Sequence, residues 1–193
     1  MVARPVQPEL STARLRHPQQ MKPEEFKAKY PFILNWIRQT IAQHTTKARP
    51  VASINFPRLP RYFSPATLAT AKVVAVDAVP LPPLTALGLG QFADFENMEA
   101  SGITYFNTIF LHDYLAEDER LHFHELVHVV QWGLLGPERF LALYADGLER
   151  FGYRDSPLEA MAYRLDGLFQ MGGALFSVER VVGRELETLL VPS

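Results

Sequence analysis

The residues His124-Glu125-Leu126-Val127-His128 form an H-E-x-x-H motif inside a segment, residues 115–132, that is predicted to be helical. A spacing of four residues places both imidazoles on one helix face, where they can bind one metal ion. Glu125 is rotated by about 100° from His124, so its carboxylate points beside the metal. Zinc lowers the pKa of bound water towards about 7, and a neighbouring carboxylate can then take the proton. The motif therefore predicts a zinc site with Glu125 as general base.

The alternative is that both histidines are core residues hydrogen-bonded to backbone or carboxylate groups. The motif lies among the apolar residues Leu121, Leu126, Val127, Val129 and Val130, which are expected to bury this helix. Burying two imidazoles and a carboxylate at this spacing is costly without a ligand. We therefore favour the metal site.

The third metal ligand must come from a carboxylate. The six histidines lie at positions 17, 44, 112, 122, 124 and 128, and the chain has no cysteine. The H-E-x-x-H-x-x-G-x-x-H class is excluded, because the later positions hold Gln131 and Leu134. The acidic candidates downstream are Glu138, Asp146, Glu149, Asp155, Glu159 and Asp166.

Among these acids we favour Glu159. A helix from Pro137 to about residue 150 would run back along the motif helix by about 21 Å at 1.5 Å per residue. The next helix, which opens at Ser156-Pro157, would then begin level with the motif. Ala162 lies about one turn after Glu159 and is small enough for close packing. In the alternative, Ser156 and Glu159 form a capping box, and Glu138 is the second choice of ligand.

The rest of the chain predicts an α+β fold, with a short sheet followed by a mainly helical C-terminal half. Twelve of the fifteen prolines precede residue 84, so the first part should be rich in turns. We expect strands at residues 72–79 and 102–111 and helices at 23–46, 115–132, 137–150, 156–170 and 175–190. Pro31 should kink the first helix or delay its start. Residues 1–20 are expected to be a poorly ordered basic arm, and residues 21–193 a single domain.

Composition excludes several classes of protein. The absence of cysteine rules out disulfides, cysteine-ligated metals and thiol catalysis. A net charge of −2 gives no reason to expect a nucleic-acid partner. No uncharged apolar run approaches about 18 residues, and no secretory signal is recognisable, so we expect a cytoplasmic protein with no membrane partner. The oligomeric state is left open.

Three segments resemble the gluzincin-type zinc metallopeptidases, in particular small bacterial metallopeptidase domains. They are residues 101–111, 124–131 (HELVHVVQ) and 157–163 (PLEAMAY). The resemblance implies a small zincin-like domain with zinc held by His124, His128 and Glu159, and with Glu125 as base. It also implies that the strand lines the cleft and pairs with an extended peptide. In well-studied gluzincins an Asp four residues after the ligand Glu supports a zinc histidine; here that position is Tyr163, and Asp166 is a turn further on.

The sequence thus predicts a zinc-dependent metallopeptidase that hydrolyses peptide bonds of a peptide or protein substrate with zinc-bound water activated by Glu125. The alternatives are a non-catalytic zinc-binding structural or interaction domain and a metal-free domain with an accidental motif. Other residues near the site have weaker roles. Tyr153, Arg154 and Tyr163 are candidate oxyanion donors, although packing or surface roles are favoured for each. His112 is interpreted as a loop residue, His122 as a surface or supporting residue, and Trp132 as core.

Overall fold

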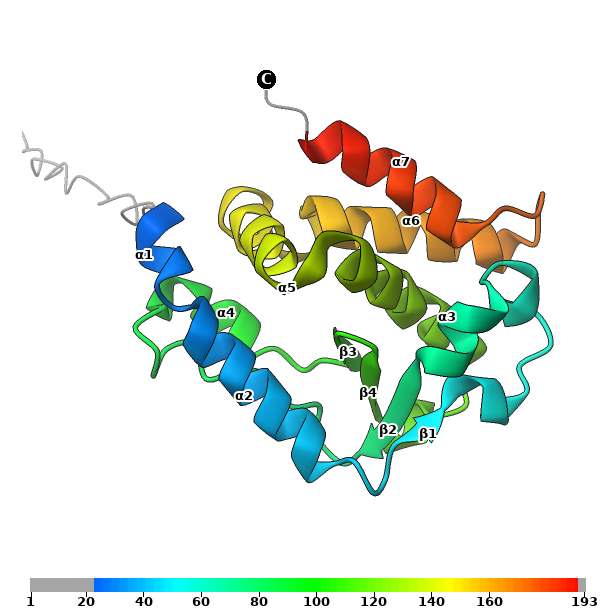
Figure 1. Ribbon diagram of the computed structural model, residues 1–193, viewed down its shortest axis with the longest axis horizontal. Coiled ribbons are helices and arrows are strands. Elements are labelled where there is room, and N and C mark those ends of the chain that lie inside the picture. The colour runs from blue at the N-terminus through cyan, green and yellow to red at the C-terminus, as the bar shows by residue number, and fades with distance from the viewer. Residues whose placement is uncertain (1–22, 191–193) are drawn as a thin grey trace, which may run out of the picture.

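The computed structural model describes residues 23–190, so the predicted arm over residues 1–20 lies outside the described residues. Element α5 (Glu119–Asp155) lies at the centre of the molecule, and non-helical backbone at Gly136 and Gly152 breaks it into helical pieces. The sheet lies on one side of α5, and α6 (Pro157–Met171) and α7 (Val178–Leu190) lie on the other (Figure 1). The predicted α+β class, with a small sheet before a mainly helical half, is confirmed.

The first predicted helix is divided in two, α1 (Pro23–Lys27) and α2 (Tyr30–Gln43). Pro31 lies in the first turn of α2, where its missing N–H leaves no helical hydrogen bond unmade. Proline therefore delays the helix start, as its position predicts. Ile33 and Ile37 on α2 are almost fully buried and carry the expected apolar stripe.

The sheet within residues 23–190 has the strand order β1-β2-β4-β3. Its strands are β1 (Arg49–Pro50), β2 (Lys72–Val76), β3 (Gly102–Tyr105) and β4 (Thr108–His112). Strand β2 is parallel to β4, and the other two pairs are antiparallel. Thus β3 is an edge strand, beside the N-terminal part of α5.

The prediction of one strand over residues 102–111 is wrong, because the segment is a hairpin. Tyr105 pairs with Thr108 across a two-residue turn, Phe106-Asn107. Phe106 adopts φ 55°, in the left-handed region that usually favours glycine. The β-branched and aromatic run carries no glycine at this point, and Asn107 is the one residue in the turn that favours a turn.

Short helical segments connect these elements. Helix α3 (Pro65–Thr70) starts at Ser64, whose hydroxyl oxygen accepts a hydrogen bond from the Thr67 N–H at 3.1 Å. Helix α4 (Ala93–Glu96) precedes β3. The 3₁₀ turns are at Val51–Ile54, Leu59–Arg61, Gly90–Phe92 and Asp113–Leu115.

The motif helix begins about one turn later than predicted and ends close to the predicted position. Asp118 caps its start by accepting from the Leu121 N–H at 3.0 Å. The helix continues through Gly133, where an end was expected, and is interrupted at Gly136, whose φ is 71°. This positive φ changes the chain direction directly before Pro137, so the two predicted helices meet without a connecting loop.

The core joins α5 to α6 and α7. The rings of Phe123 and Phe169 stack at 4.4 Å between centroids, and Tyr62 packs edge-on against both. Val178 and Val182 of α7 are fully buried. Between residues 23 and 190, no helix combines the length and apolarity required to cross a bilayer.

Candidate metal centre

Two histidines from α5 meet one glutamate from α6. The Nε2 atom of His124 lies 3.4 Å from Oε2 of Glu159, and Nε2 of His128 lies 3.4 Å from Oε1. The two Nε2 atoms are 3.2 Å apart. All three residues are buried, and one ligand atom from each lies within 4.8 Å of the others. The favoured third ligand, Glu159, is therefore in place.

The hydrogen-bond partners of the two imidazoles define which nitrogen carries the proton. Nδ1 of His124 faces Oδ2 of Asp166 at 3.1 Å, and Nδ1 of His128 faces Oε1 of Gln131 at 2.8 Å. The amide of Gln131 is oriented by donating from Nε2 to the Leu158 carbonyl at 3.0 Å. Both partner oxygens accept, so both Nδ1 atoms donate and the neutral rings present bare Nε2 lone pairs to Glu159.

This convergence of acceptors fits a cation. Two nitrogen lone pairs and a carboxylate repel one another at these distances unless a positive charge lies among them. Glu159 Oε2 is buried and has no hydrogen-bond partner within the described residues, as expected of an atom aimed at a metal. The group can therefore hold a metal ion.

Protons take the place of the metal when none is bound. Burial alone would lower the pKa of His124, but its close contacts with the carboxylates of Asp166 and Glu159 and the charge of Glu125 raise that pKa to about 10. Burial would raise the pKa of Glu159, but the two imidazoles outweigh it and lower that pKa. The site is thus negative enough to retain a positive charge in either form.

The Glu159 side chain faces the two imidazoles and does not cap the start of α6. Its Oε1 atom accepts from the Tyr144 hydroxyl at 2.7 Å. Ser156 is at the start of α6 but makes no side-chain cap hydrogen bond. Its hydroxyl is buried without a partner in the described part of the chain. The capping-box alternative is therefore not observed.

Glu125 lies beside the three ligands and is fixed by the edge strand. Its Oε2 atom accepts from the Thr104 hydroxyl at 2.7 Å. Burial raises the pKa of Glu125. The positive charges of His128 and His124 lower this pKa, but by a smaller amount, so that the net shift is upward. A carboxylate with a raised pKa is a better proton acceptor in neutral solution.

Gly102 leaves the space that Glu125 occupies. A Cβ at this position would lie 2.8 Å from Oε1 of Glu125 and 2.7 Å from Cδ2 of Leu111. Because side chains alternate along a strand, Gly102 and Thr104 face the same side, towards α5. The first residue of β3 must therefore be small.

We expect Gly102→Ala to destabilise the protein by about 1–3 kcal/mol, because the new methyl group collides with Leu111 and displaces the Glu125 carboxylate. Chemical denaturation followed by circular dichroism measures the free energy of unfolding. Gly90→Ala is the matched control, since a Cβ there meets no atom within 4 Å. Equal stability of Gly102→Ala and Gly90→Ala would contradict the assigned close approach.

An aromatic group covers the outer side of His124. The Tyr163 ring packs on the His124 ring at 4.6 Å between centroids, and the Arg154 guanidinium lies 4.9 Å from the centre of the Tyr163 ring. Tyr153 is hydrogen-bonded to Tyr163. The three candidate oxyanion residues thus gather at the mouth of the site.

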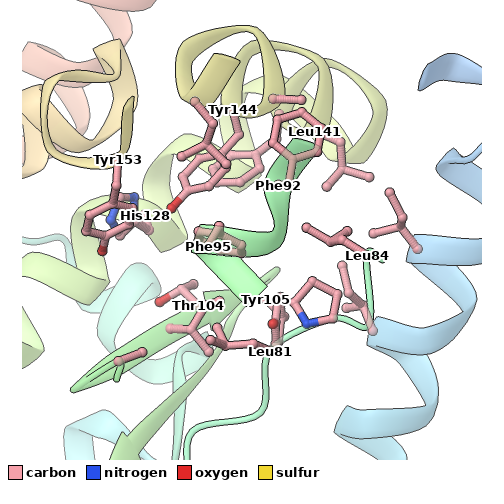
Figure 2. Close-up of a pocket in the computed structure, with 18 of the residues that line it drawn as sticks. Leu81, Leu84, Phe92, Phe95, Thr104, Tyr105, His128, Leu141, Tyr144 and Tyr153 are labelled. Carbon is pink, nitrogen blue, oxygen red and sulfur yellow. The ribbon is translucent and has the colours of Figure 1, made fainter. Parts of the chain in front are cut away.

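Two cavities meet at Glu125. The first, called the chamber here, is lined largely by apolar residues and also by Glu125, His128 and Glu159. Figure 2 shows it between His128 and Tyr153 at one end and Leu81 and Leu84 towards α2 at the other. The second, called the groove, is more polar and open, and contains His124. The site is therefore reached from two sides of different polarity.

The other predicted residues lie outside the ligand group. Glu138, Asp146 and Asp155 are exposed, and Glu149 is on the second part of α5. Asp166 is buried and supports His124, with a further ion pair to Arg120 at 2.9 Å. Asp166, and not the residue at position 163, therefore accepts the hydrogen bond from His124 Nδ1.

The prediction for His122 as a surface or supporting residue is wrong. His122 is fully buried, its Nδ1 donates to the Asp118 carbonyl, and its ring packs at 4.7 Å from that of Phe56. It lies on the core side of α5 because a two-residue step moves it about 200° around the helix from His124. His112 pairs with Asp113 at the end of β4, and Trp132 is buried as expected.

Sequence reasoning missed three supporting residues: Gln131, Thr104 and Tyr144. Gln131 had a usable signal, because it lies three residues after His128 and so on the same helix face. Thr104 and Tyr144 had none, because their contacts with Glu125 and Glu159 depend on how β3 and the second part of α5 pack.

No protein-family model, curated protein or solved structure matches this chain in the comparisons made with each. The function is therefore argued from the site itself.

Proposed function

We propose that this protein is a zinc-dependent metallopeptidase. The observation that carries the proposal is the position of Glu125, a buried carboxylate beside the His124–His128–Glu159 group where two cavities meet. A structural metal site does not require a general base beside the metal or an open coordination position, whereas a catalytic site requires both. The gluzincin-like motif in the sequence supports the same conclusion.

Zinc is the metal that best fits these donors. Two imidazole nitrogens and one carboxylate form the His₂Glu set of catalytic zinc sites, in which a further coordination position stays open. Among residues 23–190, no fourth histidine or acidic residue joins the group. This favours catalysis over the alternative, a structural zinc site closed by four protein ligands.

The residues of the chain would share the remaining chemistry. Bound zinc supplies a Lewis acid that lowers the pKa of water and polarises a carbonyl group. Glu125 accepts the proton from the attacking water and delivers it to the leaving amine. Tyr153 is a candidate donor to the developing negative oxygen: burial and the charge of Glu159 raise its pKa, which keeps the phenol protonated.

Strand β3 offers an edge on which an extended substrate can pair. The His112 N–H donates to the Ser101 carbonyl across the hairpin, and backbone pairing alternates along antiparallel strands. The backbone groups of Gly102 and Thr104 therefore point to the outer edge, although the Thr104 carbonyl already accepts from Trp132 Nε1 at 3.0 Å. The remaining groups suit β-augmentation by a peptide.

Metal analysis and a peptide-library assay test the proposal. We expect about one zinc per chain, as in other His₂Glu sites, and cleavage that a chelator stops and added zinc restores. Metal-loaded protein that cleaves no peptide would support the structural alternative. Protein that takes up no zinc after supplementation would contradict the site as a whole.

A further inference from the structure

The chamber extends from the metal group to the N-terminal helices. The centre of a water-sized sphere can occupy about 80 Å³ within it. Its lining includes Phe26 of α1, Ile33 and Ile37 of α2, and Glu159. Figure 2 shows His128 at one end of it and Leu84 at the other, on the side of α2. A group bound here would have its reacting bond beside Glu125 and its remainder pointing to α2.

The side chains of the chamber offer almost no free hydrogen-bonding group to a ligand. The Tyr105 hydroxyl donates to the Pro80 carbonyl at 2.8 Å, and Trp132 Nε1 donates to Thr104. The hydroxyls of Thr104 and Tyr144 donate to Glu125 and Glu159. A polar group entering beyond the metal centre would lose its hydration without replacement, which is unfavourable.

The groove on the other side of Glu125 has the opposite character. Asp118 and Glu99 are exposed there, and the half-exposed Arg120 is paired with Asp166. The two cavities share Met98, Ala100, Gly102, Glu125 and Tyr153. A substrate spanning both therefore passes Glu125 at the boundary between an apolar and a polar environment.

We propose that the substrates are amphiphilic amides, with a large apolar group in the chamber and a polar chain in the groove. The apolar group can be an acyl chain or an apolar amino-acid side chain, since both present the same hydrocarbon surface. The inference rests on the proposed function, because it places the scissile amide beside Glu125.

A chain-length series separates this inference from the peptidase activity. Full-length, zinc-loaded Glu125→Gln is titrated by calorimetry with acetyl-, butanoyl-, hexanoyl- and octanoyl-Gly-Ser-Gly amide. Binding should tighten about fourfold per methylene until the chamber is full. The 6-hydroxyhexanoyl peptide should lose this gain, because its hydroxyl is buried unpaired. Acetyl-Phe- and acetyl-Leu-Gly-Ser-Gly amides test the side-chain source in the same assay.

Filling the chamber provides the second test. Ala145 lines the chamber, whereas Ala142 lies one turn earlier on α5 and does not. In Ala145→Leu and in Ala145→Phe, the increase in affinity from the acetyl to the octanoyl peptide should be at least tenfold smaller than in the parent protein. In Ala142→Leu this increase should be unchanged. Circular dichroism shows which variants fold.

The outcomes distinguish the two proposals. Affinity that does not change along the acyl series and is equal for the Phe and Leu peptides would overturn the inference, even if wild-type protein cleaves peptides. A gain that persists in folded Ala145 variants would also overturn it. Affinity that rises with apolar size and is lost in those variants supports the chamber, even if wild-type protein cleaves nothing, a result that would contradict the peptidase alone.

Discussion

Replacing Glu159 by alanine is expected to weaken zinc binding by more than about 100-fold. Loss of a group that only orients a ligand costs 10–100-fold in affinity, and Glu159 is the single carboxylate among the three ligands. Among residues 23–190 no other histidine or acidic residue joins the group, so nothing replaces Glu159 at the metal. Competition with a chromophoric chelator measures the dissociation constant.

Glu138→Ala is the control for this experiment, because Glu138 was the second choice of ligand and is exposed. It should bind zinc as tightly as the wild type. Glu159→Asp keeps the charge but withdraws it by one methylene, so intermediate affinity is expected. Full zinc retention by a folded Glu159→Ala protein would remove Glu159 from the ligand set.

Replacing Glu125 by glutamine is expected to lower peptide cleavage by about 10²–10⁴-fold, the contribution usual for general acid–base catalysis. Glutamine preserves the shape and can still accept from Thr104, but its amide cannot take up the proton. The zinc content should stay unchanged, since Glu125 is not among the three ligands. Steady-state kinetics with a cleaved library peptide, together with metal analysis, measures both effects.

The control for Glu125 is Glu117→Gln, an exposed glutamate just before α5. It removes the same charge from the same region and should leave kcat and the zinc content unaltered. Cleavage by zinc-loaded Glu125→Gln at the wild-type rate would show that another group is the base. A Glu125→Gln protein that loses its zinc would instead make Glu125 a ligand.

Local periodicity explains why the motif itself could be read from the sequence. His124 and His128 share a helix face because of the four-residue spacing, and Pro157 marks the start of α6. The absence of any later histidine required an acidic third ligand. Glu159 could then be selected among six acids because the approximate lengths of two helices decide where α6 begins.

A turn that contains neither glycine nor proline was not predictable from the sequence. The Phe106-Asn107 turn carries a positive φ on an aromatic residue, so β3 and β4 looked like one strand. Gly133 looked like a helix end but is tolerated inside α5, because helix packing outweighs the roughly 1 kcal/mol cost of one glycine.

The sequence by itself determined which residues could hold a metal ion, because ligand spacing is a property of one helix and of the next helix start. Only the tertiary structure decided what surrounds them. Asp166 and Thr104 reach His124 and Glu125 through the packing of α6 and β3 on α5. The chamber likewise exists because α1 and α2 lie opposite the metal group, a long-range arrangement that no local pattern encodes.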